Sequence, residues 1–359
     1  PWALVMAFIN IYFIKTKQDK KLKNTKTLFL KNSFPILGLL FLLPSLSITY
    51  KTYNSQVSQM IILQDFNTDQ FNIPLDKVES IPSIPNVTVT TIPIDAIKAR
   101  YYFNYKKYDK ALENALKSEK ANPYLHYGDI IASKIYRIKG DNGNALKYLQ
   151  KAFFGLPNNT LHISEYLKFI LDTSNIEALE EAYPLLTKTN TLTGWKSYLI
   201  TKSTLTPAGD PILISRAEKA QKLFPYDNEF KQLLKTSRIG AIRINKAFSI
   251  GQQAQSKYNE QSFIEAAKLY ETAIELDPYE YSYYENAALC YYTLNDIDNA
   301  LLNINKVVDE MNPLNGKCEF IKGLIYLKLG ISEDACSLFD ISIASGFKSA
   351  ESAKAQYCK

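Results

Sequence analysis

Small residues recur at a fixed interval in the last third of this 359-residue chain. Ala266 is followed by Ala300 after 34 residues, and Ala300 is followed by Ala335 after another 35. An apolar or aromatic residue stands four positions after each alanine, and a proline closes the first two units: Tyr270, Ile304, Phe339, Pro278 and Pro313. A fixed period in this range indicates a stack of similar supersecondary units. We therefore predict that each unit is a helix, a tight turn and a second helix.

The same spacing occurs earlier in the chain. Ala111 and Ala145 are also 34 residues apart, and counting on by 34 reaches Leu179 and then Leu213. These last two units have lost the small residue, and the second contains the insertion Thr204–Pro211. We interpret them as degenerate repeats that keep their phase.

The phase breaks between Leu213 and Ala266, which are 53 residues apart. The stretch 227–257 contains no proline and predicts one long connecting helix, weakened at most at Gly240 and Gly251.

The period, the small residues, the aromatics and the closing prolines together resemble the tetratricopeptide repeat (TPR) family. The resemblance implies an all-α solenoid. In such repeats the small residue lets two helices approach closely, and aromatics fill the space between units.

The formal net charge of +6 has a single source. Seven lysines between Lys15 and Lys31, less Asp19, account for all of it, so the remaining chain is neutral. A nucleic-acid-binding protein needs a basic face on its folded part. We therefore expect no nucleic-acid partner and interpret the lysines as a signal of membrane topology.

Two uncharged apolar runs flank these lysines. Asn32–Tyr50 has 19 residues, close to the roughly 20 that span a bilayer, and its two prolines are tolerable in a membrane helix; a buried core helix is the alternative. Trp2–Ile14 has only 13 residues, and the chain starts at Pro1, so we interpret this run as the end of a truncated spanning helix. A signal peptide would place its basic cluster before the apolar run. Basic loops stay cytoplasmic, so the chain after Tyr50 is expected outside the cytoplasm.

These patterns predict an order of segments along the chain. They are a truncated transmembrane helix (1–14), a basic cytoplasmic loop (15–31), a transmembrane helix (32–52), a proline-containing linker (53–94), a first, partly degenerate TPR array (95–226), the connecting helix (227–257), a second array (258–348) and a capping helix (349–359).

Residues for catalysis or for a cofactor are not recognisable in the sequence. Its two histidines, His126 and His162, lack partners at the spacing of a metal site or a catalytic triad. There is no glycine-rich phosphate loop and no zinc motif. We assign no catalytic, metal or cofactor residue, and leave open whether a larger parent protein is an enzyme.

The four cysteines lie in the second array and its cap. Cys290 and Cys318 are each on the first helix of a unit, where a buried free thiol is the simplest interpretation. If the chain turns at Gly346, Cys336 and Cys358 lie at similar heights on antiparallel helices. A bridge would then be geometrically possible and would persist outside the cytoplasm. We expect a Cys336–Cys358 disulfide, with two free thiols as the alternative.

The first helices of a repeat array line its concave groove, where such folds bind extended ligands. The spacing of the TPR family implies these groove candidates: Tyr127, Lys134, Arg137, Glu285, Tyr292, Lys317 and Lys328. A solvated helix face is the alternative for each. The ligand would be a protein or a glycan, with the bilayer as a further partner of the N-terminal helices.

Two membrane segments followed by outward repeats resemble the C-terminal region of bacterial O-antigen ligase or polymerase-like proteins. The phrases IPIDAIKARYYFNYKKYDKAL, AFFGLPNNTLH and GFKSAESAKAQYC are similar to that family's repeat region. The resemblance implies a periplasmic repeat domain, attached to the bacterial inner membrane, in a protein that assembles lipid-linked glycans. A membrane-anchored TPR adaptor that recruits cell-envelope proteins is the alternative.

Overall fold

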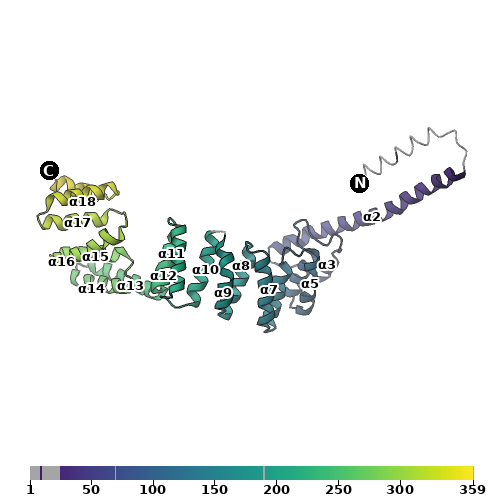
Figure 1. Ribbon diagram of the computed structural model, residues 1–359, viewed down its shortest axis with the longest axis horizontal. Coiled ribbons are helices and arrows are strands. Elements are labelled where there is room, and N and C mark those ends of the chain that lie inside the picture. Colours follow the sequence, from purple (N-terminus) through teal and green to yellow (C-terminus); the bar gives the residue numbers. More distant parts are fainter. Residues whose placement is uncertain (1–8, 10–24, 69, 189–190, 359) are drawn as a thin grey trace. The chain divides into compact units, whose positions relative to one another are not determined.

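The computed structural model describes residues 9, 25–68, 70–188 and 191–358, and it leaves the side chains of 25–37 and 39 undescribed. All regular secondary structure in these residues is helical, as predicted (Figure 1). The chain divides into two compact units, Pro1–Tyr166 and Leu167–Lys359, with the boundary inside α8 (Thr160–Thr173). We describe each unit by itself.

The first unit contains a long helix followed by short ones. They are α2 (Thr25–Asn67), α3 (Leu75–Glu79), α4 (Ile94–Asn104), α5 (Tyr108–Ala121), α6 (Tyr127–Ile138), α7 (Asn142–Gly155) and the start of α8. Helices α4 and α5 pack as one pair and α6 and α7 as the next. The repeated alanines Ala111 and Ala145 are fully buried on the second helix of each pair. A larger side chain there would overpack the contact, at a cost of about 1–3 kcal/mol.

Helix α2 differs from the segments predicted over it. Part of the expected basic loop, 25–31, and the start of the expected linker, 53–67, belong to this helix. The linker begins later because no proline occurs between Pro44 and Pro74, and because Ile62 and Phe66 are buried against the first repeat. The predicted segment 1–14, apart from Ile9, and residues 15–24 of the predicted basic loop lie outside the described residues.

No helix in the part of the chain that the structure describes is both long and apolar enough to cross a bilayer. The predicted span, 32–52, overlaps the undescribed side chains.

A buried carboxylate fixes the end of α2 to the first repeat. Asp65 accepts hydrogen bonds from the Tyr101 hydroxyl and from the backbone N–H groups of Asn72 (3.0 Å) and Ile73 (3.2 Å). Burial opposes the charged form of Asp65, but these donors outweigh burial and lower its pKa. The Arg100 guanidinium lies 4.5 Å from the Phe66 ring centre.

The second unit holds the remaining helices. They are α9 (Ile176–Lys188), α10 (Leu192–Leu205), α11 (Pro211–Leu223), α12 (Asn228–Ile239), α13 (Ala241–Asn259), α14 (Phe263–Leu276), α15 (Tyr281–Thr293), α16 (Ile297–Asn305), the π-helical turn η1 (Lys306–Met311), α17 (Lys317–Lys328), α18 (Ser332–Ala344) and α19 (Ser349–Tyr357). Leu179 and Leu213 take the place of the repeated alanine on α9 and α11 and are buried there.

The single connecting helix predicted over 227–257 is wrong. Helix α12 ends at Ile239, Gly240 has φ +84°, and α13 starts at Ala241. Gly240 combines this φ with a ψ of 145°, a backbone conformation that is strained for residues with a side chain, so glycine permits this sharp break. Helix α12 packs on α10 and α11, whereas α13 pairs with α14. The additional helix α12 explains why 53 residues separate Leu213 from Ala266.

Three helix pairs follow: α13 with α14, α15 with α16, and α17 with α18. Ala266, Ala300 and Ala335 are each fully buried in their pair. Gly251 does not weaken α13, which is continuous through it. A side chain at this position would bring its Cβ to 2.6 Å from the Tyr283 ring, so the glycine is needed for close packing between α13 and α15.

Candidate binding surface

A buried charge joins the first helices of two adjacent units, α15 and α17. Glu285 on α15 is only 1% exposed, and its carboxylate lies 3.2 Å from the amino group of Lys317 on α17. The Asn315 side chain donates a second hydrogen bond to it at 3.1 Å, and Lys317 also donates to the Asn286 side-chain oxygen at 2.8 Å. The carboxylate is therefore paired and hydrogen-bonded, as burial requires.

A second contact joins the same two helices at their other ends. The Lys328 amino group donates to the Tyr292 carbonyl oxygen at 2.9 Å and to the Asn295 side chain at 3.1 Å. It also lies 4.3 Å from the centre of the Tyr292 ring, within cation–π range. Burial raises the pKa of the Tyr292 hydroxyl, which therefore stays protonated and can donate a hydrogen bond.

These two contacts bring together the four groove residues predicted in the second array. Glu285 and Tyr292 come from α15, and Lys317 and Lys328 from α17. We call the surface formed by these four residues and Asn286 the α15–α17 surface. Its negative charge is compensated internally, while Lys328 remains exposed and is held by neutral oxygens and a ring. The surface can offer the Asn286 amide, the Tyr292 ring and the Lys328 cation to a ligand.

The three groove residues predicted in the first unit lie in different surroundings. The Tyr127 hydroxyl accepts a hydrogen bond from Arg100 at 2.7 Å, and its ring lies 5.8 Å from that of Phe66, so it packs at the junction with α2. The Lys134 amino group lies 2.7 Å from the Glu165 carboxylate of α8. Arg137 is half-buried in the last turn of α6.

The two histidines lie close together, which sequence spacing did not indicate. His126 Nδ1 is 2.9 Å from the carboxylate of the buried Asp129, and the ring centres of His126 and His162 are 6.5 Å apart. His162 is 1% exposed, and its Nδ1 lies 3.0 Å from the Ala152 carbonyl oxygen. Burial lowers the pKa of His162. In the described residues, no three acidic, histidine or cysteine side chains meet in a group that could hold a metal ion.

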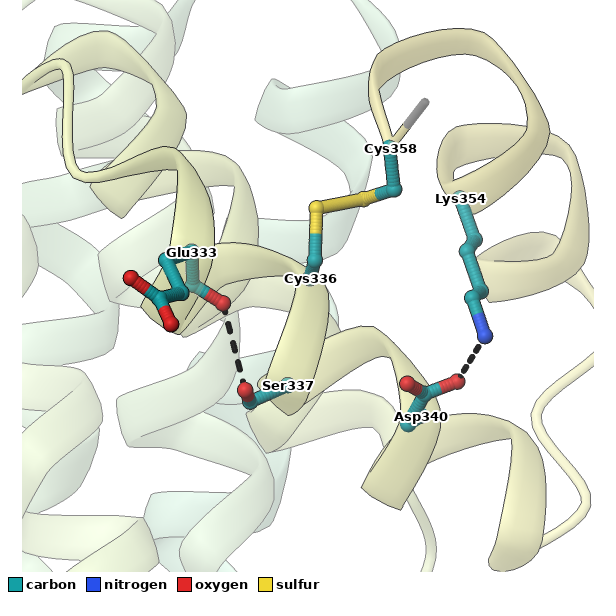
Figure 2. Close-up of a disulfide and its surroundings, with 6 residues drawn as sticks. All are labelled: Glu333, Cys336, Ser337, Asp340, Lys354 and Cys358. Carbon is teal, nitrogen blue, oxygen red and sulfur yellow. Dashed lines mark hydrogen bonds and ion pairs between the residues drawn. A yellow bond between two sulfur atoms is a disulfide. The ribbon is translucent and has the colours of Figure 1, made fainter.

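The cysteines form one bridge and leave two thiols. Cys336 and Cys358, the predicted pair, are joined by a disulfide with a Cα–Cα distance of 5.8 Å (Figure 2). Cys290 and Cys318 are free and fully buried, and burial raises the pKa of each thiol to about 12. Such thiols are neutral and unreactive at ordinary pH.

Sequence reasoning missed the three asparagines of this region. Asn286 is one residue from a predicted groove position, so a wider window on the same helix would have included it. Asn295 and Asn315 lie in the turns before α16 and α17, outside the repeated helical positions. Only the folded turns bring their amides to Lys328 and Glu285.

No protein-family model and no curated protein matches the chain. Solved structures do resemble it. A tetratricopeptide repeat protein from Parabacteroides merdae is 10% identical with a TM-score of 0.33, over 84% of this chain and 97% of that one. The TPR2AB-domain of yeast Sti1, in its pHSP90 complex, is 15% identical with a TM-score of 0.28, over 73% of this chain and 93% of that one. Yeast Tom70 is 12% identical with a TM-score of 0.28, over 83% and 77%.

The helix pairs and the buried alanines at the repeated positions are properties of the chain itself. It is an all-α protein built from TPR-like helical repeats.

Proposed function

We propose that the chain is a binding scaffold whose α15–α17 surface holds an extended segment of a protein partner. The observation behind this proposal is the ladder of contacts from Glu285 to Lys317 and from Tyr292 to Lys328. These contacts place equivalent faces of α15 and α17, the first helices of two consecutive pairs, side by side. Backbone amides of an extended peptide need hydrogen-bond partners, and the amide of Asn286 and the hydroxyl of Tyr292 can supply them.

The mixed character of the surface favours a peptide over a glycan as its occupant. Lys328 can pair with a carboxylate, and the Tyr292 ring can pack against an apolar side chain. A glycan could use the same amides and ring, so it remains the second candidate.

A photoreactive residue can test this assignment. It would replace Tyr292 in one variant and Leu302 in a control, because Leu302 is 70% exposed on α16, a second helix. Each purified variant is irradiated with an extended-peptide library and, separately, with a set of oligosaccharides. We expect peptide adducts at position 292 only. Oligosaccharide adducts at 292 would favour the glycan, and equal labelling at 292 and 302 would contradict a groove.

Membrane attachment through α2 is the second part of the proposal. Leu40, Phe41 and Leu46 are 62%, 75% and 49% exposed. Successive residues of a helix point about 100° apart, so Phe41 lies about 100° and Leu46 about 240° around the helix from Leu40, and the three apolar side chains face different directions. A helix that is apolar all round suits a lipid environment, whereas a protein groove would cover a single stripe.

Quenching by brominated lipids would test this attachment. Phe41→Trp is compared with Leu302→Trp, both in the full chain mixed with vesicles of neutral and anionic phospholipids. We expect additional quenching for the residue at position 41. Equal quenching in the two variants would contradict insertion of α2.

The orientation and the parent protein complete the proposal. The lysines between Lys15 and Lys31 support a cytoplasmic loop before the apolar run, and with it a periplasmic repeat region at the bacterial inner membrane. The phrases similar to O-antigen ligase or polymerase-like proteins support a glycan-assembly parent, with a separate membrane-anchored adaptor as the alternative. Protease treatment of spheroplasts tests the orientation, since protected repeats would contradict it. Upstream sequence that encodes further membrane helices would favour the glycan-assembly parent.

A further inference from the structure

Helix α19 covers the last apolar surface of the second array. Ala350 and Ala353 are buried against Phe339 of α18. Three side chains of α17 are half-buried around the same contact: Phe320, Leu324 and Leu327. The end of a helical-repeat array needs such a cover, because its apolar face would otherwise contact water.

Few contacts of its own hold α19 in place. It has nine residues, and its two buried side chains are alanines, which bury little apolar area. Helices shorter than about 12–15 residues are marginal in water unless tertiary packing supports them. Lys354 pairs with Asp340, but these side chains are 42% and 56% exposed, and exposed ion pairs contribute little (Figure 2).

The disulfide ties down the far end of this helix. Cys358 follows Tyr357, the last residue of α19, and is bonded to Cys336 in the first half of α18 (Figure 2). Both cysteines are half-buried, so a small thiol can reach the bridge. Cys290 and Cys318 are fully buried and lie outside this reach.

The near end is fixed at Phe347. Its N–H donates to the Ser342 carbonyl oxygen at 3.1 Å, and its ring centre lies 5.2 Å from that of Phe320. The Ser342 hydroxyl in turn donates to the Gly316 carbonyl oxygen at 2.5 Å. The chain up to Phe347 is thus tied to α17 and α18, and the segment 348–358 depends on the bridge.

We propose that the Cys336–Cys358 disulfide is a redox latch that holds α19 closed over the end of the array. A dithiol opens it by thiol–disulfide exchange: one thiolate attacks the bridge, and closure of the resulting mixed disulfide releases both cysteines as thiols. The dithiol is oxidised to a cyclic disulfide and supplies the two electrons and two protons. Release of α19 then exposes Phe320, Leu324 and Leu327. The latch proposal rests on the contacts of α19 and does not depend on the α15–α17 binding proposal.

Hydrogen exchange of the full chain with and without dithiothreitol tests the latch. In the reduced protein we expect amides 349–357 to exchange faster by on the order of a hundredfold, the factor that closure of a loop of this size implies. Amides of α17 and α18 should keep their protection. Unchanged protection of 349–357 after reduction, with both thiols verified by mass, would overturn the proposal.

Two variants separate the bridge from other contacts. Cys336→Ser with Cys358→Ser should exchange like reduced protein even under oxidising conditions. Lys354→Ala removes the ion pair but keeps the bridge, so it should stay protected until dithiothreitol is added. Fast exchange in oxidised Lys354→Ala would show that the ion pair, and not the disulfide, holds α19.

Discussion

The amino group of Lys317 lies 3.2 Å from the carboxylate of Glu285, a side chain that is 1% exposed and belongs to the preceding helix pair. This ion pair therefore connects two consecutive helix pairs. Because a buried carboxylate without a cation is costly, the pair fixes how α15 and α17 pack.

Lys317→Met should destabilise the second unit by about 2 kcal/mol. This value is below the roughly 3–5 kcal/mol lost when a fully buried pair is broken, because Lys317 is partly exposed and Asn315 still donates to the carboxylate. Urea unfolding followed by circular dichroism measures the change. Adding Glu285→Gln should recover part of the loss, and a double variant no more stable than Lys317→Met would contradict a charge effect.

Gly251→Ala should destabilise the same unit by about 1–2 kcal/mol. The new Cβ would lie 2.6 Å from the Tyr283 ring, and this overpacking exceeds the roughly 1 kcal/mol that alanine gains over glycine in a helix. Gly143→Ala in α7 is the matched control, because its Cβ would meet only the Asp141 side chain at 3.6 Å. Thermal unfolding should show a lower midpoint for the first variant and an equal or higher one for the second.

The sequence was sufficient to predict the repeats but not the break between them. Each helix pair leaves a small residue at a fixed interval in the sequence. Ala266, Ala300 and Ala335 must each be small because the two helices of their pair pack closely there. Helix α12 leaves no such trace because it has no counterpart in the other units. Gly240 looked like a weak point in a helix, and only its positive φ shows that the chain turns there.

The candidate surface was partly predictable for a similar reason. Glu285, Tyr292, Lys317 and Lys328 occupy repeated helical positions, so spacing alone could propose them. Their asparagine partners lie in turns, whose geometry spacing does not determine. Tyr127 has the same kind of position on α6, but α2 covers it, and no repeat rule predicts a helix from outside the array.

Acid should weaken the packing around His162. Burial lowers the folded-state pKa of this histidine, so below the ordinary value of about 6.5 the unfolded chain takes up a proton that the native state resists. The contribution of neutral His162 to folding stability is therefore fully present above about pH 6.5. It is lost as the pH falls from this value toward the lower pKa of the folded state. The size of this pH-dependent loss of stability also depends on the neighbouring groups His126, Asp129 and Lys151.

Helix α7 reports on this site, because the carbonyl oxygen of its Ala152 lies 3.0 Å from His162 Nδ1. Hydrogen exchange of the α7 amides between pH 7.5 and 5, corrected for intrinsic exchange rates, measures the pH dependence. His162→Gln should remove most of the pH-dependent loss of protection, because a glutamine does not titrate in this range. An unchanged pH dependence in the variant would assign the effect to another group, with His126→Gln as the comparison.

Asp65→Ala should loosen the junction between α2 and the first repeat. The carboxylate accepts hydrogen bonds from Tyr101, Asn72 and Ile73, and its loss leaves those donors without this acceptor. Bonds to a charged group contribute about 1.5–3 kcal/mol each, although they are not additive, so we expect a total loss of about 2–4 kcal/mol. Tyr101→Phe removes a single donor and should cost less. In limited proteolysis of Asp65→Ala, we expect cleavage near residues 68–73 before cleavage of the repeats. Early cleavage within α4 to α7 would instead indicate a general loss of stability.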